Sequence, residues 1–335
     1  MDRGNRTSVV PAAPASVELD GELRYGSASA VPSLLDAPAT TAWTVVVLAS
    51  EHPERVSRLL AALRVHAPAG TGVVVVANDP SDAQVAALGP EAAGRAPIGF
   101  IVPEVLRTST RLGYAAALNV GLRRASGEFV LLTDASAWPT GDAMTPLAAA
   151  FEDRSIAAAG GYGLYAESRG PLRPNALGRE PATQHATAGA GATAGATAEA
   201  TAGAGATATA EATALEGAWL AFRRSDYGNL GPLDERIVTP AWLDVWWTLR
   251  LRAGAEPEGA EYVDSEASDR LEESSAGEAV EAVAHDVEMP APRRAIALEL
   301  PLGREDVAWP PDRSRLNRRN MYRVLDRFGW REDLA

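Results

Sequence analysis

The chain has 335 residues, of which 46% are hydrophobic, and a formal net charge of -13; this length allows one large domain or two modest ones. All of its basic residues are arginine and it contains no cysteine, which excludes disulfides, thiolate metal sites, Schiff-base lysines and P-loop lysines. Residues 255–290 hold twelve acidic residues and one arginine, so the remainder is close to neutral, which argues against a nucleic-acid-binding protein.

No stretch of the sequence approaches the roughly 20 consecutive apolar residues that a membrane-spanning helix needs. The N-terminus also lacks the continuous apolar segment of a signal peptide. We therefore expect a cytoplasmic protein, with at most peripheral association with the inner face of a membrane.

Three segments have a biased composition and no sustained period. Residues 1–42 are rich in proline, alanine and serine and are predicted to be mostly disordered. Residues 186–214 contain only alanine, threonine, glycine and two glutamates, and we interpret them as a low-complexity insertion. The acidic residues 255–290 form a second such segment, because like charges extend a chain. The folded part is then expected in residues 43–254, with a strand and an amphipathic helix in residues 291–335 packing on it.

The remaining apolar runs alternate with helical patterns, as they do in βαβ units. Strands are predicted at residues 43–49, 73–77, 98–102, 129–133, 156–162 and 217–223. Helices are predicted at residues 53–65, 83–88, 113–125, 144–151, 241–253 and 314–328. This order predicts a single Rossmann-like α/β domain, with a mostly parallel central sheet flanked by helices.

Residues 111–136 form the most informative stretch of the chain. A helical pattern rich in small residues is followed by Gly127 and then by an apolar run, and Asp134 comes directly after that run. Such a run is typical of a buried parallel strand, and ligands of open α/β sheets bind where these strands end. We therefore expect the Asp134 carboxylate at the mouth of a cleft. A carboxylate that only caps the turn before Pro139 is the alternative interpretation.

This stretch resembles the family 2 glycosyltransferases, which have the GT-A fold. In that family a helix of small residues with a conserved spacing of glycine and asparagine precedes a strand ending in Asp-x-Asp, and this motif holds a divalent metal that grips the diphosphate of a sugar nucleotide. Ser136 stands in place of the second aspartate. The matching positions are Gly113, Asn119, Gly121, Gly127 and Asp134.

The resemblance implies a divalent cofactor, Mn²⁺ or Mg²⁺, held by Asp134 with Ser136 beside it, since carboxylate oxygens suit these hard ions. Many proteins of this fold add a C-terminal histidine as a metal ligand, and His285 is the candidate. The alternative is that His285 is a solvated residue of the acidic segment.

The second predicted strand ends in VVVVANDPSD. Family members show a similar Val-Asp-Asn-x-Ser-x-Asp sequence here, whose first aspartate bonds the nucleotide base. Ala77 occupies that position, so the resemblance implies that Asn78 and Asp79 lie near the base. Asp82 has a structural explanation as a helix N-cap.

Residues 217–236 resemble the acceptor-side segment of the family, and Asp244 follows at the position of the catalytic base. In the family this carboxylate deprotonates the acceptor hydroxyl for a direct, inverting attack. The neighbouring acids of the family motif are replaced by Leu243 and Trp246. Alternatively, Asp244 is only the polar side of a half-buried helix whose tryptophans, Trp242, Trp246 and Trp247, pack in the core or stack on sugar rings.

The sequence thus predicts a glycosyltransferase that moves a sugar from a nucleotide-diphosphate sugar to a hydroxyl of a glycan or lipid-linked acceptor, with inversion, in cell-surface polysaccharide or glycoconjugate synthesis. The alternative is a catalytically inactive relative that binds or scaffolds. Four departures from the family motifs favour the alternative: Ala77, Ser136, Leu243 and Trp246.

Overall fold

The computed structural model describes most of the chain between residue 16 and residue 334. The acidic segment, the predicted strand at 98–102 and nearly all of the predicted helix at 83–88 lie outside the described residues. The described residues are 16–19, 22–49, 53–82, 84, 103–166, 177–181, 209–254, 291–305, 314–328 and 334.

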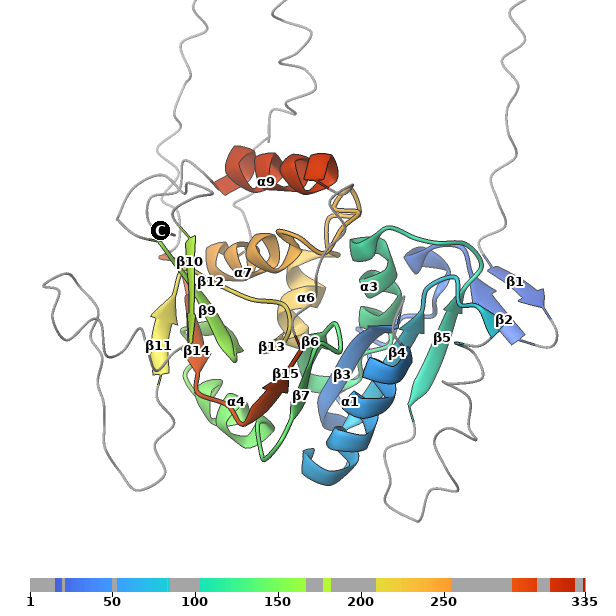
Figure 1. Cartoon of the computed structure of the whole chain (residues 1–335), viewed down its shortest axis with the longest axis horizontal. Helices are drawn as coiled ribbons and strands as arrows, with labels where there is room; N and C mark the ends of the chain where they lie inside the picture. Colours follow the sequence, from blue (N-terminus) through green and yellow to red (C-terminus); the bar gives the residue numbers. More distant parts are fainter. Residues whose placement is uncertain are drawn as a thin grey trace, which may run out of the picture.

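A central sheet of ten strands organises the fold (Figure 1), in the order β1-β2-β5-β4-β3-β6-β13-β8-β14-β11. The neighbours from β2 to β6 all run parallel, while β13 is antiparallel to both β6 and β8. These strands are β1 (Ser16–Leu19), β2 (Glu22–Tyr25), β3 (Thr41–Ala49), β4 (Gly72–Ala77), β5 (Glu104–Thr108), β6 (Gly127–Thr133), β8 (Ile156–Gly160), β11 (Thr209–Ala212), β13 (Leu220–Arg223) and β14 (Arg294–Leu298). The predicted α/β class with a central, mostly parallel sheet is confirmed.

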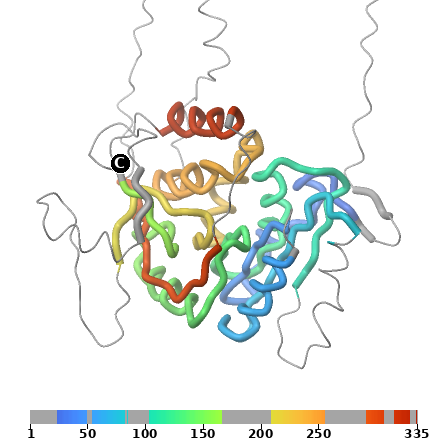
Figure 2. Tube along the Cα trace, in the orientation of Figure 1, coloured from blue at the N-terminus to red at the C-terminus, as the bar shows by residue number. Residues whose placement is uncertain are grey.

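The smaller sheets lie beside the central one. β9 (Tyr162–Ala166) pairs with β10 (Leu177–Pro181) and β12 (Ala214–Leu215), and β7 (Ala137–Pro139) pairs with β15 (Leu302–Arg304). Figure 2 shows how β14 and β15, near the C-terminal end of the chain, run beside segments from its middle. This return brings residue 304 opposite residue 137, directly after the predicted motif.

Helices cover both faces of the sheet (Figure 1). One apolar core contains side chains of α3 (Tyr114–Leu122), α6 (Arg224–Leu230) and α7 (Leu243–Ala253). The core on the other face contains side chains of α1 (Pro53–His66) and α4 (Met144–Ala150). Both cores share the sheet because β3, β4 and β6 are continuous apolar runs, buried on both sides.

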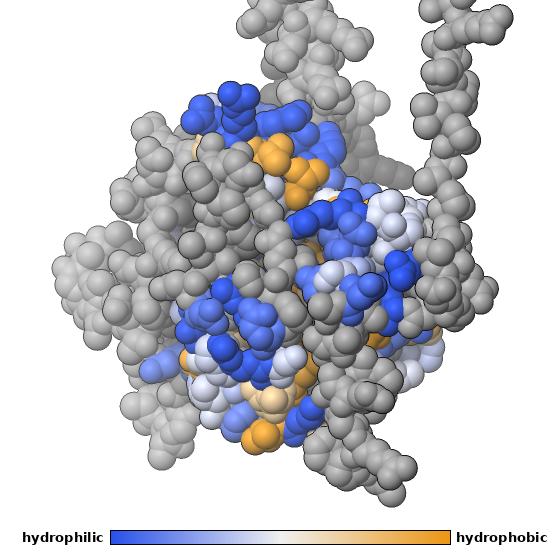
Figure 3. All heavy atoms as spheres, turned by 45° about the vertical axis from the view of Figure 1, so that its right-hand side comes forward, coloured by the Kyte–Doolittle hydropathy of each residue, from blue (hydrophilic) through white to orange (hydrophobic). Residues whose placement is uncertain are grey.

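Helix α9 (Ser314–Phe328) adds an outer layer on α7. Val324 and Phe328 are buried, and the Phe328 ring meets the Trp246 ring edge-on at 6.5 Å between centroids. The outward face of α9 is hydrophilic (Figure 3) and carries exposed arginines such as Arg318 and Arg319. In the described ranges, no helix is both long enough and apolar enough to cross a membrane.

Two glycines of the predicted motif are required by packing. A Cβ on Gly121 would lie 2.6 Å from Val46 Cγ1 and 2.8 Å from Val76 Cγ2, so α3 can approach the sheet only without that atom. A Cβ on Gly127 would lie 2.5 Å from the Thr44 backbone nitrogen. The small residues of the motif therefore set the depth at which α3 lies on β3 and β4.

The prediction of disorder across residues 1–42 is wrong for its second half. Strands β1 and β2 join the sheet, β2 runs parallel to β5, and the 3-10 helix η1 (Ala28–Ala30) follows. Tyr25 and Val31 are buried. A few apolar side chains are enough here because β5 offers an edge of unpaired backbone groups.

The low-complexity insertion also proves shorter than predicted. Its last residues form β11, which pairs antiparallel with β14, and the first residue of β12. Ala212 and Ala214 are buried. Their small side chains suit a close approach between strands, so burial does not need the large apolar residues that the segment lacks.

Candidate active site

A cavity of about 380 Å³ lies at the carboxyl end of β6. Strands β4 and β5 lie to one side of β3 and β6 to the other, so this is the point at which the strand order reverses and ligands of open sheets bind. The polar or ionisable side chains lining it come from α3, the end of β6, the β12–β13 connection, α7 and β15. They include Tyr114, Asp134, Ser136, Glu216, Asp244 and Arg304.

Asp134 is fixed by a tight turn at the end of β6. Its Oδ1 accepts hydrogen bonds from the Ser136 backbone N–H at 2.9 Å and from the Ser136 hydroxyl at 2.6 Å. Ala135 between them has a left-handed φ of 65°, which lets the turn close. The turn-capping role therefore exists, but it uses only Oδ1. Among the described residues nothing bonds Oδ2, and the side chain lines the cavity.

Asp244 reaches the same cavity from the first turn of α7. Its Oδ2 accepts a hydrogen bond from the Gly217 N–H at 2.9 Å and its Oδ1 from the Val245 N–H at 2.8 Å. Burial raises the pKa of Asp244 above its usual value, the backbone hydrogen bonds oppose this, and the Asp134 carboxylate raises it further. The result is a carboxylate more basic than an exposed aspartate.

Tyr114 lines the same cavity as these two carboxylates. Burial raises the pKa of its hydroxyl well above the usual 10.0, and the charges of Asp134 and Asp244 raise it further. The phenol therefore stays protonated and can donate a hydrogen bond near both acids. The first two N–H groups of α3 donate to the carbonyls of Val238 and Ile237, which ties Tyr114 to the segment leading into α7.

Glu216 and Arg304 form an ion pair in the wall of the cavity. Arg304 donates through both terminal nitrogens to the two Glu216 oxygens, at 2.8 and 2.7 Å. The guanidinium also lies over the Tyr162 ring, 4.6 Å from its centroid. Sequence reasoning missed Tyr114, Glu216 and Arg304. Tyr114 stood inside the motif stretch and could have been noticed, whereas the other two meet only through strand pairing.

The predicted base-binding residues lie at the same sheet edge but outside this cavity. Asn78 is buried, and its side chain bonds the Thr108 hydroxyl and both backbone groups of Leu112. Asp79 is exposed, has a left-handed φ of 52°, and its N–H donates to the Thr108 hydroxyl. Asn78 thus positions the loop before α3, and Asp79 offers its carboxylate to solvent beside the site. The predicted ligand His285 lies outside the described residues.

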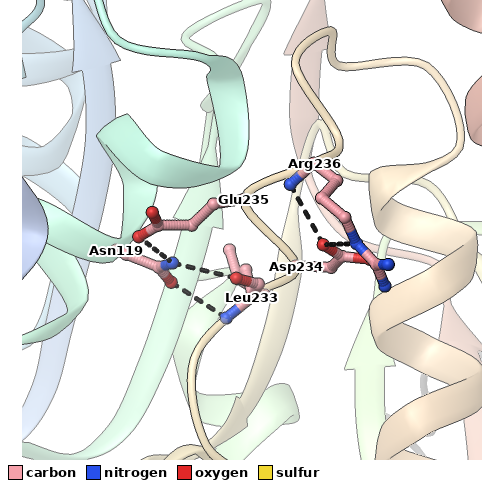
Figure 4. Close-up of polar contacts among 5 residues, drawn as sticks. All are labelled: Asn119, Leu233, Asp234, Glu235 and Arg236. Carbon is pink, nitrogen blue, oxygen red and sulfur yellow. Dashed lines mark hydrogen bonds and ion pairs between the residues drawn. The ribbon is translucent and has the colours of Figure 1, made fainter. Parts of the chain in front are cut away.

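Asn119 explains why the motif places an asparagine in α3 (Figure 4). Its amide donates to the Leu233 carbonyl at 3.0 Å and to Glu235 at 3.1 Å, and its oxygen accepts from the Leu233 N–H at 2.9 Å and the Tyr227 hydroxyl at 3.1 Å. Beside it, Arg236 donates to Asp234 (Figure 4). Asn119 therefore holds Tyr227, Leu233 and Glu235 against α3, and Leu233 lines the cavity.

The three tryptophans of α7 have different surroundings. Trp247 is buried and meets the Phe222 ring edge-on, with 5.4 Å between centroids. Trp246 is also buried and stacks on Trp247. Trp242 lines the cavity in a left-handed conformation, with φ 72°, which is uncommon for a bulky residue. Trp246 and Trp247 are core residues, although Trp247 also borders the cavity, and Trp242 is the less buried of the two tryptophans that line it.

The oxygen atoms of the site suit a divalent ion only if a bound substrate supplies further ligands to that ion. No group of three or more His, Asp or Glu side chains that could hold a metal occurs within the described part of the chain. At the end of β6 the protein offers Asp134 Oδ2 and the Ser136 hydroxyl oxygen. Mg²⁺ and similar ions are often bound through one or two carboxylates with substrate phosphates and water completing the shell. These residues thus suit an ion that arrives with a diphosphate.

A cavity lined by carboxylates at the ends of parallel strands is typical of α/β proteins that bind a small molecule, many of them enzymes. Residues 44–194 match the glycosyl transferase family 2 model. This match agrees with the resemblance drawn from the motif at residues 111–136. No match was found among curated proteins.

Solved glycosyltransferase structures show more distant similarity. The mannosyltransferase PcManGT from Pyrobaculum calidifontis, in complex with GDP-Man and Mn²⁺, is 19% identical with a TM-score of 0.45, covering 68% of this chain and 57% of that one. GalNAc-T7 with UDP, GalNAc and Mn²⁺ is 17% identical with a TM-score of 0.47, covering 65% and 41%. S. aureus TarS 1-349 in complex with UDP-GlcNAc is 17% identical with a TM-score of 0.39, covering 62% and 52%. The chain spans less than two thirds of the length of each.

Proposed function

We propose that the protein is an inverting glycosyltransferase that moves a sugar from a nucleotide-diphosphate sugar to an acceptor hydroxyl. One observation carries the proposal: Asp134 and Asp244 reach the same cavity from different elements, and their charges are close enough to raise the pKa of Asp244 and of Tyr114. A donor-side carboxylate and a separate basic carboxylate are the two groups that this reaction requires.

Asp244 is the proposed general base. The acceptor oxygen attacks the anomeric carbon as the bond from that carbon to the diphosphate oxygen breaks, and the hydroxyl proton passes to Asp244. The Gly217 and Val245 N–H groups hold the carboxylate in one orientation, and its raised pKa favours proton uptake. Attack from the face opposite the leaving group inverts the anomeric centre.

Asp134 and Ser136 would hold a divalent ion together with the donor diphosphate. Such an ion, when bound, supplies positive charge to the leaving nucleoside diphosphate. Asn78 would keep the loop before α3 in place beside the nucleotide, and Asp79 would contact the base. The acceptor is a glycan or a lipid-linked sugar, and Trp242 offers its ring to an apolar sugar face.

Thermal-shift titration with UDP-, GDP- and TDP-sugars, with and without Mn²⁺, tests the donor assignment. A donor should raise the melting temperature, more so with Mn²⁺, and Asp134→Ala should remove the Mn²⁺-dependent part. Asp326→Asn, an exposed change on α9, serves as the charge-matched control. Absence of any shift with every donor would contradict the proposal.

A catalytically inactive binding protein is the second candidate. It is favoured by Asp244, whose two oxygens both accept backbone hydrogen bonds and so also have a structural use. The two functions separate in a product assay with a donor that binds. Transfer that is lost in Asp244→Asn, with donor binding kept, supports the enzyme; donor binding with no transfer to any glycan or lipid-linked acceptor supports the inactive relative.

A further inference from the structure

The cavity has an unfavourable charge balance for its proposed ligand. Among the described residues that line it, Arg304 is the only cation, beside the carboxylates of Asp134, Glu216 and Asp244. A diphosphate adds further negative charge, and at most one protein carboxylate at the end of β6 is free to recruit a metal ion. A positive group that the protein itself supplies would therefore favour binding.

Arg304 is delivered to this place by strand pairing. β15 runs antiparallel to β7 with Arg304 opposite Ala137, and the next residue, Glu305, donates its N–H to the Ser136 carbonyl at 2.9 Å. The Glu305 side chain is bound by Arg55 and Arg58 of α1, at 3.1 and 2.9 Å. Arg304 is thus anchored directly beside the turn that holds Asp134.

The ion pair with Glu216 does not use every N–H donor of the Arg304 guanidinium. Arginine has five N–H donors, and two terminal nitrogens hold Glu216. Its Nε is buried and meets no hydrogen-bond acceptor among the described residues. The side chain is 18% exposed and that of Glu216 is 19% exposed, so the pair lies in the wall of the cavity and not on the open surface. A planar guanidinium with spare donors suits a phosphate group well.

We propose that Arg304 binds the diphosphate of the nucleotide donor and stabilises the departing nucleoside diphosphate, while Glu216 holds the guanidinium in position. This inference rests on the proposed function. It also accounts for Ser136: the motif has lost a carboxylate where β15 brings in a cation, so the charge on the leaving group does not depend on a metal ion alone.

A double-mutant cycle tests the proposal. Wild type, Arg304→Gln, Glu216→Gln and the double variant Glu216→Gln/Arg304→Gln are titrated by calorimetry with UDP, GDP and TDP and with uridine, guanosine and thymidine. Each titration is made in EDTA and in Mn²⁺. The double variant keeps the net charge of the wild-type cavity and leaves no carboxylate unpaired, so it separates a direct contact from simple neutralisation.

We expect wild type to bind one nucleoside diphosphate in EDTA. Arg304→Gln and the double variant should both bind it about tenfold to a hundredfold more weakly, as for loss of a charged hydrogen bond, with nucleoside affinity unchanged. Glu216→Gln removes a negative charge that competes with the diphosphate but keeps an oxygen that can accept from the guanidinium, so it should bind the nucleotide at least as tightly as wild type. Arg304→Lys, which keeps the charge but not the planar fork, should restore binding only in part.

Three results would overturn the proposal. Recovery of wild-type affinity in the double variant would show that Arg304 only neutralises Glu216. Equal affinity of wild type and Arg304→Gln would show that Arg304 does not touch the diphosphate, while leaving the proposed function intact. Failure of wild type to bind any nucleotide in either buffer would remove this proposal and the proposed function together.

Discussion

At the scale of single residues, the surroundings of Asp244 have opposing effects on its pKa. The N–H groups of Gly217 and Val245 favour its anion, whereas burial and the nearby Asp134 favour its neutral form, and the second influence is larger. The same imbalance that makes the carboxylate a better base makes its ionisation costly to the fold. Both consequences can be measured.

The first prediction concerns pH and activity. Transfer should fall as pH decreases through the raised pKa of Asp244, because only the ionised carboxylate accepts a proton. The apparent pKa in kcat should therefore lie above about 3.9, the value of an unperturbed aspartate. A pH–rate profile checks this. A profile that stays flat down to the ordinary aspartate range would remove Asp244 as the base.

The second prediction concerns pH and stability. Because the folded-state pKa of Asp244 is raised, the folded protein holds this proton more tightly than the unfolded chain. The contribution of Asp244 to stability is thus full below about pH 3.9 and is lost as pH rises through the folded-state pKa. Urea unfolding across this window should show that loss in wild type and in Asp326→Asn. In Asp244→Asn it should be missing.

The third prediction concerns Asn119. Asn119→Ala would leave the Leu233 N–H and carbonyl and the Tyr227 hydroxyl without their partner, all in buried surroundings. We expect the free energy of unfolding to fall by about 2–4 kcal/mol. Asn317→Ala, which removes a single bond to the Thr239 hydroxyl, should cost less than about 1.5 kcal/mol. Similar losses in both variants would argue against the special role of Asn119.

At the scale of elements, α3 packs so closely on the sheet that even a single added methyl group does not fit. Gly121→Ala would place its Cβ within 2.6 Å of Val46 Cγ1, on packed side chains of two strands. We expect a loss of about 1–3 kcal/mol in urea unfolding. Gly228→Ala in α6, where an added Cβ meets nothing within 4 Å, should instead be neutral or stabilise by up to about 1 kcal/mol. Equal effects would mean that α3 can move away.

Elements with strong local patterns were predictable. β3, β4 and β6 are continuous apolar runs, α9 has buried residues at helical spacing, and each was predicted within about two residues. β2, β11 and β15 were not, because each is short and owes its pairing to an edge supplied by a distant part of the chain. The local sequence does not show that an unpaired strand edge from elsewhere in the chain is available to pair with it.

The site follows the same division. Asp134 and Asp244 stand in readable motifs, and the structure places both in one cavity. Arg304 stands in no motif and lies 88 residues from Glu216 in the chain. Asn78 matched a family position, yet its side chain is engaged by Thr108 and Leu112, a tertiary contact that the motif alone could not show.

At the scale of the whole molecule, the sheet joins distant parts of the chain into one unit. Strands from residues 16–25 lie at one side and β14 lies within the other, so no large part of the sheet can open alone. We therefore expect a single unfolding transition in urea, with far-UV circular dichroism and tryptophan fluorescence coinciding. Phe328→Ala should lower stability by about 3–5 kcal/mol and shift both probes together. Two separate transitions would show independent units.

The position of β14 has a consequence for synthesis of the protein on the ribosome. β8 emerges long before β14, which pairs with it in parallel after more than a hundred further residues. Until then one edge of β8 has unpaired backbone groups, which can pair with other polypeptides and promote aggregation. Chaperone cover during translation, or slow elongation, would protect that interval, and products that stop short of residue 298 would keep the exposed edge permanently.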